Sequence, residues 1–280
     1  MTDFMIDGST KLYGIIGNPV KHSFSPKMHN PAFKEINLNA VYVPFLINEN
    51  DLPSLLESFR ITGVCGFNIT VPFKEKIIPF LDDLSDEARL LGSVNTVKKT
   101  NKGWVGYSTD GSGFIRSIKE SGFDFNDKKV LLIGAGGSAK AVAIALAKQN
   151  IKELIIFNRT SEKAIALEKL VKIVKPDLKT KVNPDVENFI DLMVNCTSVG
   201  MINNNCPVGD DFIKASHKIV DIVYNPAMTT LLNKAQQYNK DFQNGIGMLL
   251  YQGVESFEIW TGKKAPVELM KKCLLNTLDS

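Results

Sequence analysis

Short apolar runs alternate with helical periodicity in the N-terminal part of the chain. The runs are Lys11–Gly17, Ala40–Ile47 and Val64–Thr70. Between them, apolar residues recur with the spacing of amphipathic helices, from Ser25-Pro26 to about Ile36 and from Asp51 to about Ile61. Strand–helix–strand alternation is typical of βαβ units around a parallel sheet, so this part is predicted to be an α/β domain.

The first of these helices has two candidate starting points. Ser25 before Pro26 combines a capping hydroxyl with proline at the first helical position. Asn30-Pro31 offers a second start and would kink or split the helix. The sequence leaves both open.

The next apolar segments have the pattern of a hairpin. Val94–Lys98 and Gly103–Tyr107 flank a short polar turn, which predicts two antiparallel strands. A helix is expected to begin just after Asp110, and the first part of the chain ends there.

A second strand–turn–helix–strand series begins at Val130. The apolar strand Val130–Ile133 runs into Gly134-Ala135-Gly136-Gly137-Ser138-Ala139, and an apolar helix and the strand Leu154–Phe157 follow. Gly134, Gly136 and Ala139 match the G-x-G-x-x-G/A pattern, whose glycines allow a tight turn and bring backbone N–H groups close to a pyrophosphate. The element order predicts a Rossmann-type dinucleotide-binding domain.

The end of the second strand in this series indicates which dinucleotide is bound. An NAD site places an acidic residue about 20 residues beyond the first glycine, where it holds the ribose 2′-OH. This chain has Asn158-Arg159-Thr160 there instead, with Arg159 lying 159 − 134 = 25 residues beyond Gly134. A guanidinium suits a 2′-phosphate, so NADP is the predicted cofactor.

The C-terminal part completes this domain and then returns to the first one. Strands are expected near 191–195 and 219–223, a helix over 227–238, and two final helices over 248–261 and 266–278. Both final helices have apolar faces, which predicts that they pack back on the first domain. The expected division is therefore 1–110 with 246–280 as the substrate-binding and catalytic domain, and 111–245 as the NADP-binding domain.

Composition excludes several other classes of protein. The chain has 280 residues, 44% of them apolar, a net charge of +3 from scattered lysines, four cysteines without C-x-x-C pairing and three histidines. These features favour a soluble, cytoplasmic protein without a metal site, a membrane span or a nucleic-acid surface. No heptad or dimer stripe is visible, so the sequence leaves the oligomeric state open between a monomer and a homodimer.

Two charged residues are candidates for proton transfer. Lys74 follows Asn68–Phe73, a strand that is expected to run into a helix starting at Pro72, which would bring the ammonium to the carboxyl edge of the sheet. Asp110 begins a predicted helix. Taken alone, Lys74 is better explained as a solvated lysine and Asp110 as a helix-capping aspartate.

Several neutral polar residues could orient a substrate. Ser23 and Ser25 could both donate to a carboxylate, although Ser25 is also the expected helix cap. Thr70, Asn95, Tyr224 and Gln252 add further donors and acceptors. Each of them, taken singly, is more often a turn residue or a satisfied core residue.

Nine sequence blocks together resemble the shikimate dehydrogenase family, in the same order and over nearly the whole chain. They are GNPVKHSFSP, NITVPFKE, GSVNTV, STDG, GAGGSAKA, NRT, CTSVGM, VDIVYNP and NGIGMLLYQG. The resemblance implies an oxidoreductase of aromatic amino-acid biosynthesis that reversibly reduces 3-dehydroshikimate to shikimate with NADPH.

The resemblance also implies a role for each candidate. Lys74 and Asp110 match the catalytic pair, Ser23 and Ser25 the hydroxyls that hold the substrate carboxylate, and Thr70, Asn95, Tyr224 and Gln252 the other substrate contacts. The residues that match cofactor contacts are Gly134, Ala135, Gly136, Gly137 and Ser138 in the phosphate turn, Asn158, Arg159, Thr160 and Lys163 at the 2′-phosphate, and Ile222 and Gly245 near the nicotinamide.

Two other functions remain as alternatives. One is a quinate/shikimate dehydrogenase with relaxed choice of substrate or with NAD use, which Arg159 disfavours. The other is a non-catalytic nucleotide sensor, which would not need Lys74 and Asp110 together.

Overall fold

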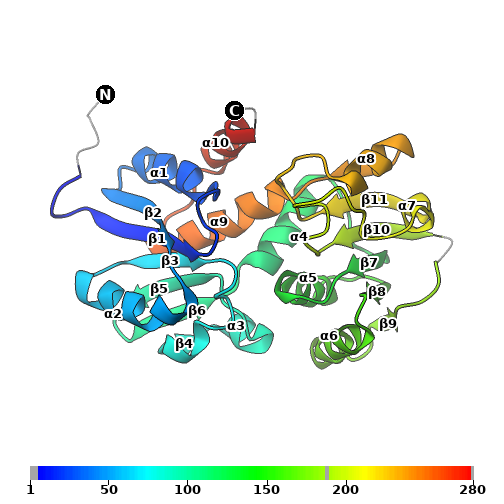
Figure 1. Ribbon diagram of the computed structural model, residues 1–280, viewed down its shortest axis with the longest axis horizontal. Helices are drawn as coiled ribbons and strands as arrows, with labels where there is room; N and C mark the ends of the chain where they lie inside the picture. Colours follow the sequence, from blue (N-terminus) through cyan, green and yellow to red (C-terminus); the bar gives the residue numbers. More distant parts are fainter. Residues whose placement is uncertain (1–5, 187–188, 279–280) are drawn as a thin grey trace. The chain divides into compact units, whose positions relative to one another are not determined.

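The computed structural model describes residues 6–186 and 189–278, which form two compact units. One unit holds the described residues up to Thr109 and those from Gln252 on, and the other holds Asp110–Tyr251. Each unit is built on its own six-stranded sheet (Figure 1). The predicted α/β fold is confirmed.

The sheet of the first unit has the strand order β2-β1-β3-β5-β6-β4. Strands β1 and β2 are parallel, as are β1 and β3, whereas β5 runs antiparallel to both β3 and β6. The predicted parallel strands and the hairpin are therefore confirmed. The strands are β1 (Lys11–Gly17), β2 (Ala40–Leu46), β3 (Gly66–Ile69), β4 (Asp83–Leu84), β5 (Thr96–Thr100) and β6 (Gly103–Tyr107).

Helices cover both faces of this sheet, and the residues of the two C-terminal helices from Gln252 on complete the unit. Helix α10 contacts α1, so the C-terminal segment packs on the first unit as predicted. The helices are α1 (Ser25–Glu35), α2 (Leu52–Thr62), α3 (Asp86–Leu91), α9 (Ile246–Thr261) and α10 (Val267–Leu278), with short 3-10 turns η1 (Glu49–Asp51) and η2 (Ile78–Phe80).

Helix α1 begins at the first of its two candidate positions, and Pro31 lies inside it. The expectation that Ser25 caps this helix was wrong. Phe24 is the N-cap residue and makes no side-chain cap bond, while Ser25 is already helical. The Ser25 hydroxyl is hydrogen-bonded to Tyr42 instead, so tertiary packing outweighs the local capping preference.

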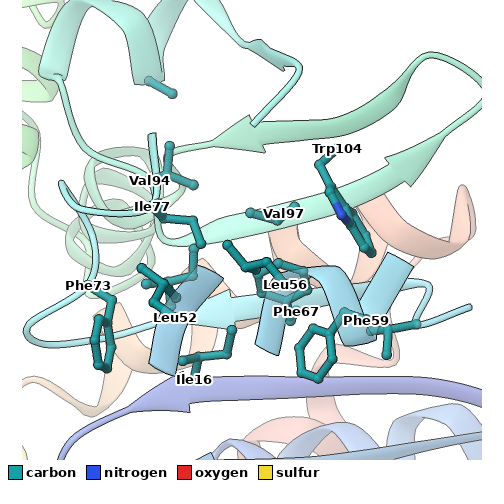
Figure 2. Packing of buried hydrophobic residues seen from close by; sticks show 13 residues of the cluster. Ile16, Leu52, Leu56, Phe59, Phe67, Phe73, Ile77, Val94, Val97 and Trp104 are labelled. Carbon is teal, nitrogen blue, oxygen red and sulfur yellow. The ribbon is translucent and has the colours of Figure 1, made fainter. Parts of the chain in front are cut away.

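The core on the α2 face of the sheet is aliphatic and aromatic (Figure 2). Leu52, Leu56 and Phe59 of α2 pack with residues of the sheet. The Phe67 ring meets the rings of Phe59 and Trp104 edge to face, at centroid distances of 5.3 and 5.2 Å. Such edge contacts add to the free energy that burial of these large side chains contributes.

The α1 face of the same unit contains a buried histidine among aromatic rings. His29 of α1 stacks on Tyr42 at a centroid distance of 4.6 Å and lies 5.3 Å from the Trp260 ring. Neither ring nitrogen has a hydrogen-bond partner. Burial lowers the pKa of His29 to about 3, so the folded protein keeps this imidazole neutral.

The second unit has an all-parallel sheet with the strand order β12-β11-β10-β7-β8-β9. The order reverses between β7 and β10, which is the arrangement of a Rossmann fold. Its strands are β7 (Lys129–Ile133), β8 (Glu153–Phe157), β9 (Lys179–Val182), β10 (Ile190–Asn195), β11 (Ser216–Asp221) and β12 (Asp241–Gln243).

Connections between the parallel strands place the helices of this unit on both faces of its sheet (Figure 1). Crossovers α5 and α6 lie between β7, β8 and β9, and α7 and α8 lie on the other half of the sheet. The helices are α4 (Asp110–Glu120), α5 (Gly137–Ala147), α6 (Ser161–Val174), α7 (Asp210–Ala215) and α8 (Thr230–Gln237). None of the helices in the described ranges has the length and apolar character needed to cross a bilayer.

The buried imidazole predicts one component of acid unfolding. The unfolded chain protonates His29 near pH 6.5, whereas the folded chain does so only near pH 3. The free energy of unfolding should therefore fall as the pH drops through this window, by up to about 1.4 kcal/mol per pH unit from this residue. The His29→Phe variant should lose this component, because phenylalanine suits an aromatic site and does not titrate.

Urea unfolding at a series of pH values between about 7.5 and 4 measures the difference in slope between wild type and variant. His217→Gln is the control, because His217 is exposed. Parallel pH dependences for wild type and His29→Phe would contradict the prediction.

Candidate functional site

The ends of β1 and β3 lie side by side in the first unit and are bonded to each other. Thr70, directly after β3, donates its backbone N–H to the Ile16 carbonyl at 2.9 Å. A Cβ atom at Gly17 would lie 2.4 Å from the Thr70 Cγ2 methyl, so glycine is required for this close approach. Thr70 therefore stands at the carboxyl edge of the sheet, where α/β proteins bind ligands.

Lys74 lies in a turn that is anchored in the core on both sides. Its neighbours Phe73 and Ile77 are fully buried, and Figure 2 shows both in the apolar cluster with Val94. The Val94 N–H donates to the Lys74 carbonyl at 2.9 Å. Lys74 itself is half-buried.

The helix predicted to start at Pro72 does not form. Residues 71–77 run through turns, and only the 3-10 turn η2 follows. Phe73 and Ile77 are joined by one helical bond, from the Ile77 N–H to the Phe73 carbonyl at 3.0 Å, and Pro79 has no N–H with which to continue the series.

Asn95 is the centre of a hydrogen-bonded group at the same edge of the sheet. Its amide Nδ2 donates to Thr109 Oγ1 at 2.9 Å, and its Oδ1 accepts the Thr109 N–H at 2.9 Å. Thr109 Oγ1 also donates to the Gln252 carbonyl at 3.0 Å. The structure thus brings Asn95 and Gln252, which are 157 residues apart in sequence, into one group.

A buried polar network centred on Asn68 is hydrogen-bonded to this group. Asn68 Nδ2 lies 3.0 Å from the Asn95 carbonyl, from Thr96 Oγ1 and from Ser256 Oγ, and Asn68 Oδ1 accepts the Tyr42 hydroxyl at 2.7 Å. Each of these buried polar groups is satisfied, which makes the network rigid.

The two serine candidates are connected to the same network. Tyr42 is hydrogen-bonded to the Ser25 side chain. Ser23 Oγ accepts the Ser25 backbone N–H at 3.3 Å, so the two candidates adjoin each other. Burial raises the pKa of Tyr42 well above its usual value, which keeps its hydroxyl a neutral donor to Asn68.

The glycine turn of the second unit has the geometry of a phosphate site. Gly134 follows β7 with a φ of 108°, and a Cβ atom there would lie 3.0 Å from Thr197 Cγ2. Gly136 is the N-cap of α5, and neither Gly136 nor Gly137 has any atom within 4 Å of the position of a Cβ. The first N–H groups of α5 have no partner within the helix, and such groups are the ones that bind a pyrophosphate in dinucleotide-binding folds.

The residues predicted to bind the 2′-phosphate follow the adjacent strand β8. Gly134 donates its N–H to the Phe157 carbonyl at 2.8 Å, which brings the glycine turn next to Asn158. Asn158 Nδ2 donates to the Thr160 carbonyl at 2.8 Å. Arg159 and Lys163 are exposed, so their cationic groups are available to an anionic ligand.

A buried carboxylate holds the segment that contains Ile222 and Tyr224. Asp221 is fully buried at the end of β11, and its carboxylate accepts the Val223 N–H at 3.0 Å and Thr229 Oγ1 at 2.7 Å. Burial raises the pKa of Asp221 despite these donors.

Gly245 lies against the same segment. It donates its N–H to the Val223 carbonyl, and a Cβ atom there would lie only 1.9 Å from the Ile222 carbonyl oxygen. Only glycine fits this position.

Asp110 is the first residue of α4 and is buried. Gly111, the next residue, allows α4 to lie close to α5, because a Cβ atom there would be 2.6 Å from the Ala141 carbonyl oxygen. Asp110 belongs to the second unit and Lys74 to the first. Their pairing stays a prediction.

Several residues that hold these groups were not predicted from the sequence. Asn68 and Asp221 had a usable signal, since each is a polar residue between two large apolar neighbours in the sequence. Thr109 had none, because its role depends on two partners distant in sequence.

Family comparisons give matches along most of the chain. Residues 15–97 match the shikimate dehydrogenase substrate binding domain, residues 117–202 match the shikimate/quinate 5-dehydrogenase family, and residues 245–275 match the shikimate 5′-dehydrogenase C-terminal domain.

Individual relatives match over nearly their full length. The shikimate dehydrogenase (NADP(+)) of Methanococcus maripaludis is 42% identical over an alignment of 279 residues. The match covers 96% of this chain and 98% of the relative. A crystal structure of a shikimate dehydrogenase in complex with NADP+ has a TM-score of 0.91 at 38% identity and covers 98% of both chains. The shikimate 5-dehydrogenase of Thermus thermophilus, solved with NADP(H) and shikimate, has a TM-score of 0.87 at 31% identity and covers 96% of this chain and 100% of its own. The predicted family is thereby confirmed, and this chain belongs to the shikimate dehydrogenase family.

Proposed function

We propose that this protein catalyses the reversible NADPH-dependent reduction of 3-dehydroshikimate to shikimate, with Lys74 as the proton donor and acceptor and Asp110 as its partner. The reaction and the cofactor are those of the family. One observation in this chain carries the assignment of Lys74. Its turn is anchored by Phe73 and Ile77 at the sheet edge where Thr70 and the Asn95 group also lie.

The substrate half of the site lies on the first unit. Ser23 and Ser25 hold the substrate carboxylate, and Thr70, Asn95 and Gln252 contact the ring hydroxyls. Because the network around Asn68 already fixes Asn95 and Ser25, little side-chain entropy is lost when the substrate binds. The remaining proposed substrate contact, Tyr224, belongs to the second unit, where it follows the segment held by Asp221.

The cofactor half lies on the second unit. The N–H groups of the turn from Gly134 to Ser138, including those of Ala135, Gly136 and Gly137, hold the pyrophosphate. Asn158, Arg159, Thr160 and Lys163 hold the 2′-phosphate, and Ile222 and Gly245 border the nicotinamide. When bound, NADPH supplies the hydride to the ketone carbon.

Lys74 stabilises the charge that develops during this transfer. Negative charge builds up on the ketone oxygen, and the ammonium of Lys74 donates a proton to it. In the direction of oxidation, the neutral amine accepts the proton of the alcohol. Asp110 orients the ammonium. We also propose that the protein is a monomer or a homodimer. We place it in the cytoplasm, which is consistent with a biosynthetic enzyme.

An absorbance assay that crosses two substrates with two cofactors tests the proposed function. Shikimate and quinate are each combined with NADP+ and NAD+, and the appearance of reduced nicotinamide is followed. Shikimate with NADP+ should give the highest kcat/KM. Equal rates with quinate or NAD+ would favour a relaxed quinate/shikimate dehydrogenase, and nucleotide binding without turnover would favour a nucleotide sensor.

Lys74→Ala should mainly lower kcat. Loss of general acid–base catalysis costs about 10²–10⁴-fold, while the Kd for NADP+ should stay nearly unchanged because Lys74 is not among the cofactor residues. In wild type, shikimate oxidation should speed up as the pH rises, since the neutral amine is the base. Lys76→Ala is the matched control, because Lys76 is exposed two residues further on. Activity of Lys74→Ala within about tenfold of wild type would exclude this role.

Arg159→Ala should weaken NADP+ and leave NAD+ almost unaffected. A charged hydrogen bond to the 2′-phosphate contributes about 1–3 kcal/mol, which corresponds to roughly 5- to 150-fold in Kd. Isothermal titration calorimetry with both nucleotides measures the two affinities. Lys169→Ala removes an exposed charge on the following helix, α6, and serves as the control. Equal weakening of both nucleotides would show that Arg159 does not recognise the phosphate.

A further inference from the structure

Asn183 makes an unusual set of contacts beside the segment Asn158–Thr160. It is the first residue after β9, and its backbone N–H donates to the Ile156 carbonyl at 3.0 Å. Its side-chain Oδ1 accepts the Asn158 N–H at 2.8 Å, and its Nδ2 donates to the Asn158 carbonyl at 3.0 Å. One amide group therefore satisfies both backbone polar groups of Asn158.

These two bonds continue the sheet beyond its last regular pair. The β8–β9 ladder ends at the pair Ile156 and Val182. Past that point, the backbone of β9 no longer supplies partners for Asn158, and the Asn183 side chain takes over that role. Asn183 has a φ of 44°, in the left-handed region that asparagine tolerates better than most residues.

The same side chain also contacts the start of the next helix. Asn183 Nδ2 lies 3.0 Å from the hydroxyl of Ser161, the first residue of α6. Asn158 Nδ2 in turn donates to the Thr160 carbonyl. The segment from Asn158 to Ser161 is thus fixed at both ends, and the exposed Arg159 projects from between two fixed points.

We propose that Asn183 is a positioning residue for recognition of the 2′-phosphate of NADP. It holds the backbone of Asn158 in the conformation from which Arg159 reaches the phosphomonoester. This inference rests on the proposed function of Arg159. A site that is fixed before binding loses less conformational entropy when the ligand arrives, so loss of the Asn183 side chain weakens the phosphate contact even though Asn183 does not touch the phosphate.

The test is the ratio of the two nucleotide affinities in Asn183→Gly, measured by calorimetry without substrate. Glycine accepts the left-handed backbone, so the change removes the side-chain contacts without straining the chain, and the control corrects for the added backbone freedom. The Kd for NADP+ should rise by roughly tenfold, while that for NAD+ changes by less than about twofold. A matched control is Asn239→Gly, since Asn239 is an exposed asparagine of the same unit with a φ of 50°.

A double-mutant cycle shows whether Asn183 acts through Arg159. If it does, Asn183→Gly should cause almost no further change in the NADP+/NAD+ ratio when Arg159 is already alanine. Amide hydrogen exchange at residues 158–161 gives a readout independent of binding, and exchange should become faster in Asn183→Gly than in Asn239→Gly.

Three outcomes would overturn the inference. They are equal weakening of NADP+ and NAD+, unchanged affinity for both nucleotides, and an additive effect in the cycle. An unchanged NADP+ affinity in Arg159→Ala would overturn the proposed role of Arg159 as well. Normal NADP+ selectivity in Asn183→Gly, with selectivity lost in Arg159→Ala, would overturn only the role of Asn183.

Discussion

The ends of the parallel strands impose the constraint on which both halves of this protein depend. Helices cover the two faces of each sheet, but the backbone groups at the carboxyl ends of the strands need partners from elsewhere. In the first unit, the segment after β3 contains Thr70 and Lys74. In the second unit, the segments after β7, β8 and β11 contain the glycine turn, Arg159 and Ile222. The residues proposed to bind substrate and cofactor thus lie mainly where the regular hydrogen bonding stops.

Buried or half-buried polar side chains supply hydrogen-bond partners near these strand ends. Asn68 satisfies groups on β5 and α9, Asp221 holds the Val223 N–H and Thr229, and Asn183 pairs with Asn158. A buried polar group left unsatisfied costs about 1–3 kcal/mol, so each of these side chains strongly favours one conformation of its loop. The same bonds that complete the fold therefore set the positions of the proposed ligand contacts.

In both units, glycine allows two segments of the chain to lie unusually close together. Gly17 lets β1 pass the Thr70 methyl, and Gly245 lets the start of α9 pass the Ile222 carbonyl. At Gly136 and Gly137, in contrast, the space above the backbone is open. Glycine at the first kind of position serves packing, whereas at the second it leaves room for a ligand.

The class of fold, the family and most of the candidate residues could be predicted from the amino-acid sequence alone. Apolar periodicity and the glycine motif report on local backbone geometry, which neighbouring residues in the chain control. The two helix starts that were predicted from a proline show the limit of this local information. Ser25 and Pro72 both have local helix-start features. Ser25 nevertheless bonds to Tyr42, because a buried tertiary contact outweighs a helix cap of about 1 kcal/mol. Pro72 leads into turns and not into a helix. Only the tertiary structure decided how Asn95, Thr109 and Gln252 meet and how Asn183 reaches Asn158, because hydrogen bonds between residues far apart in sequence leave no periodic pattern in it.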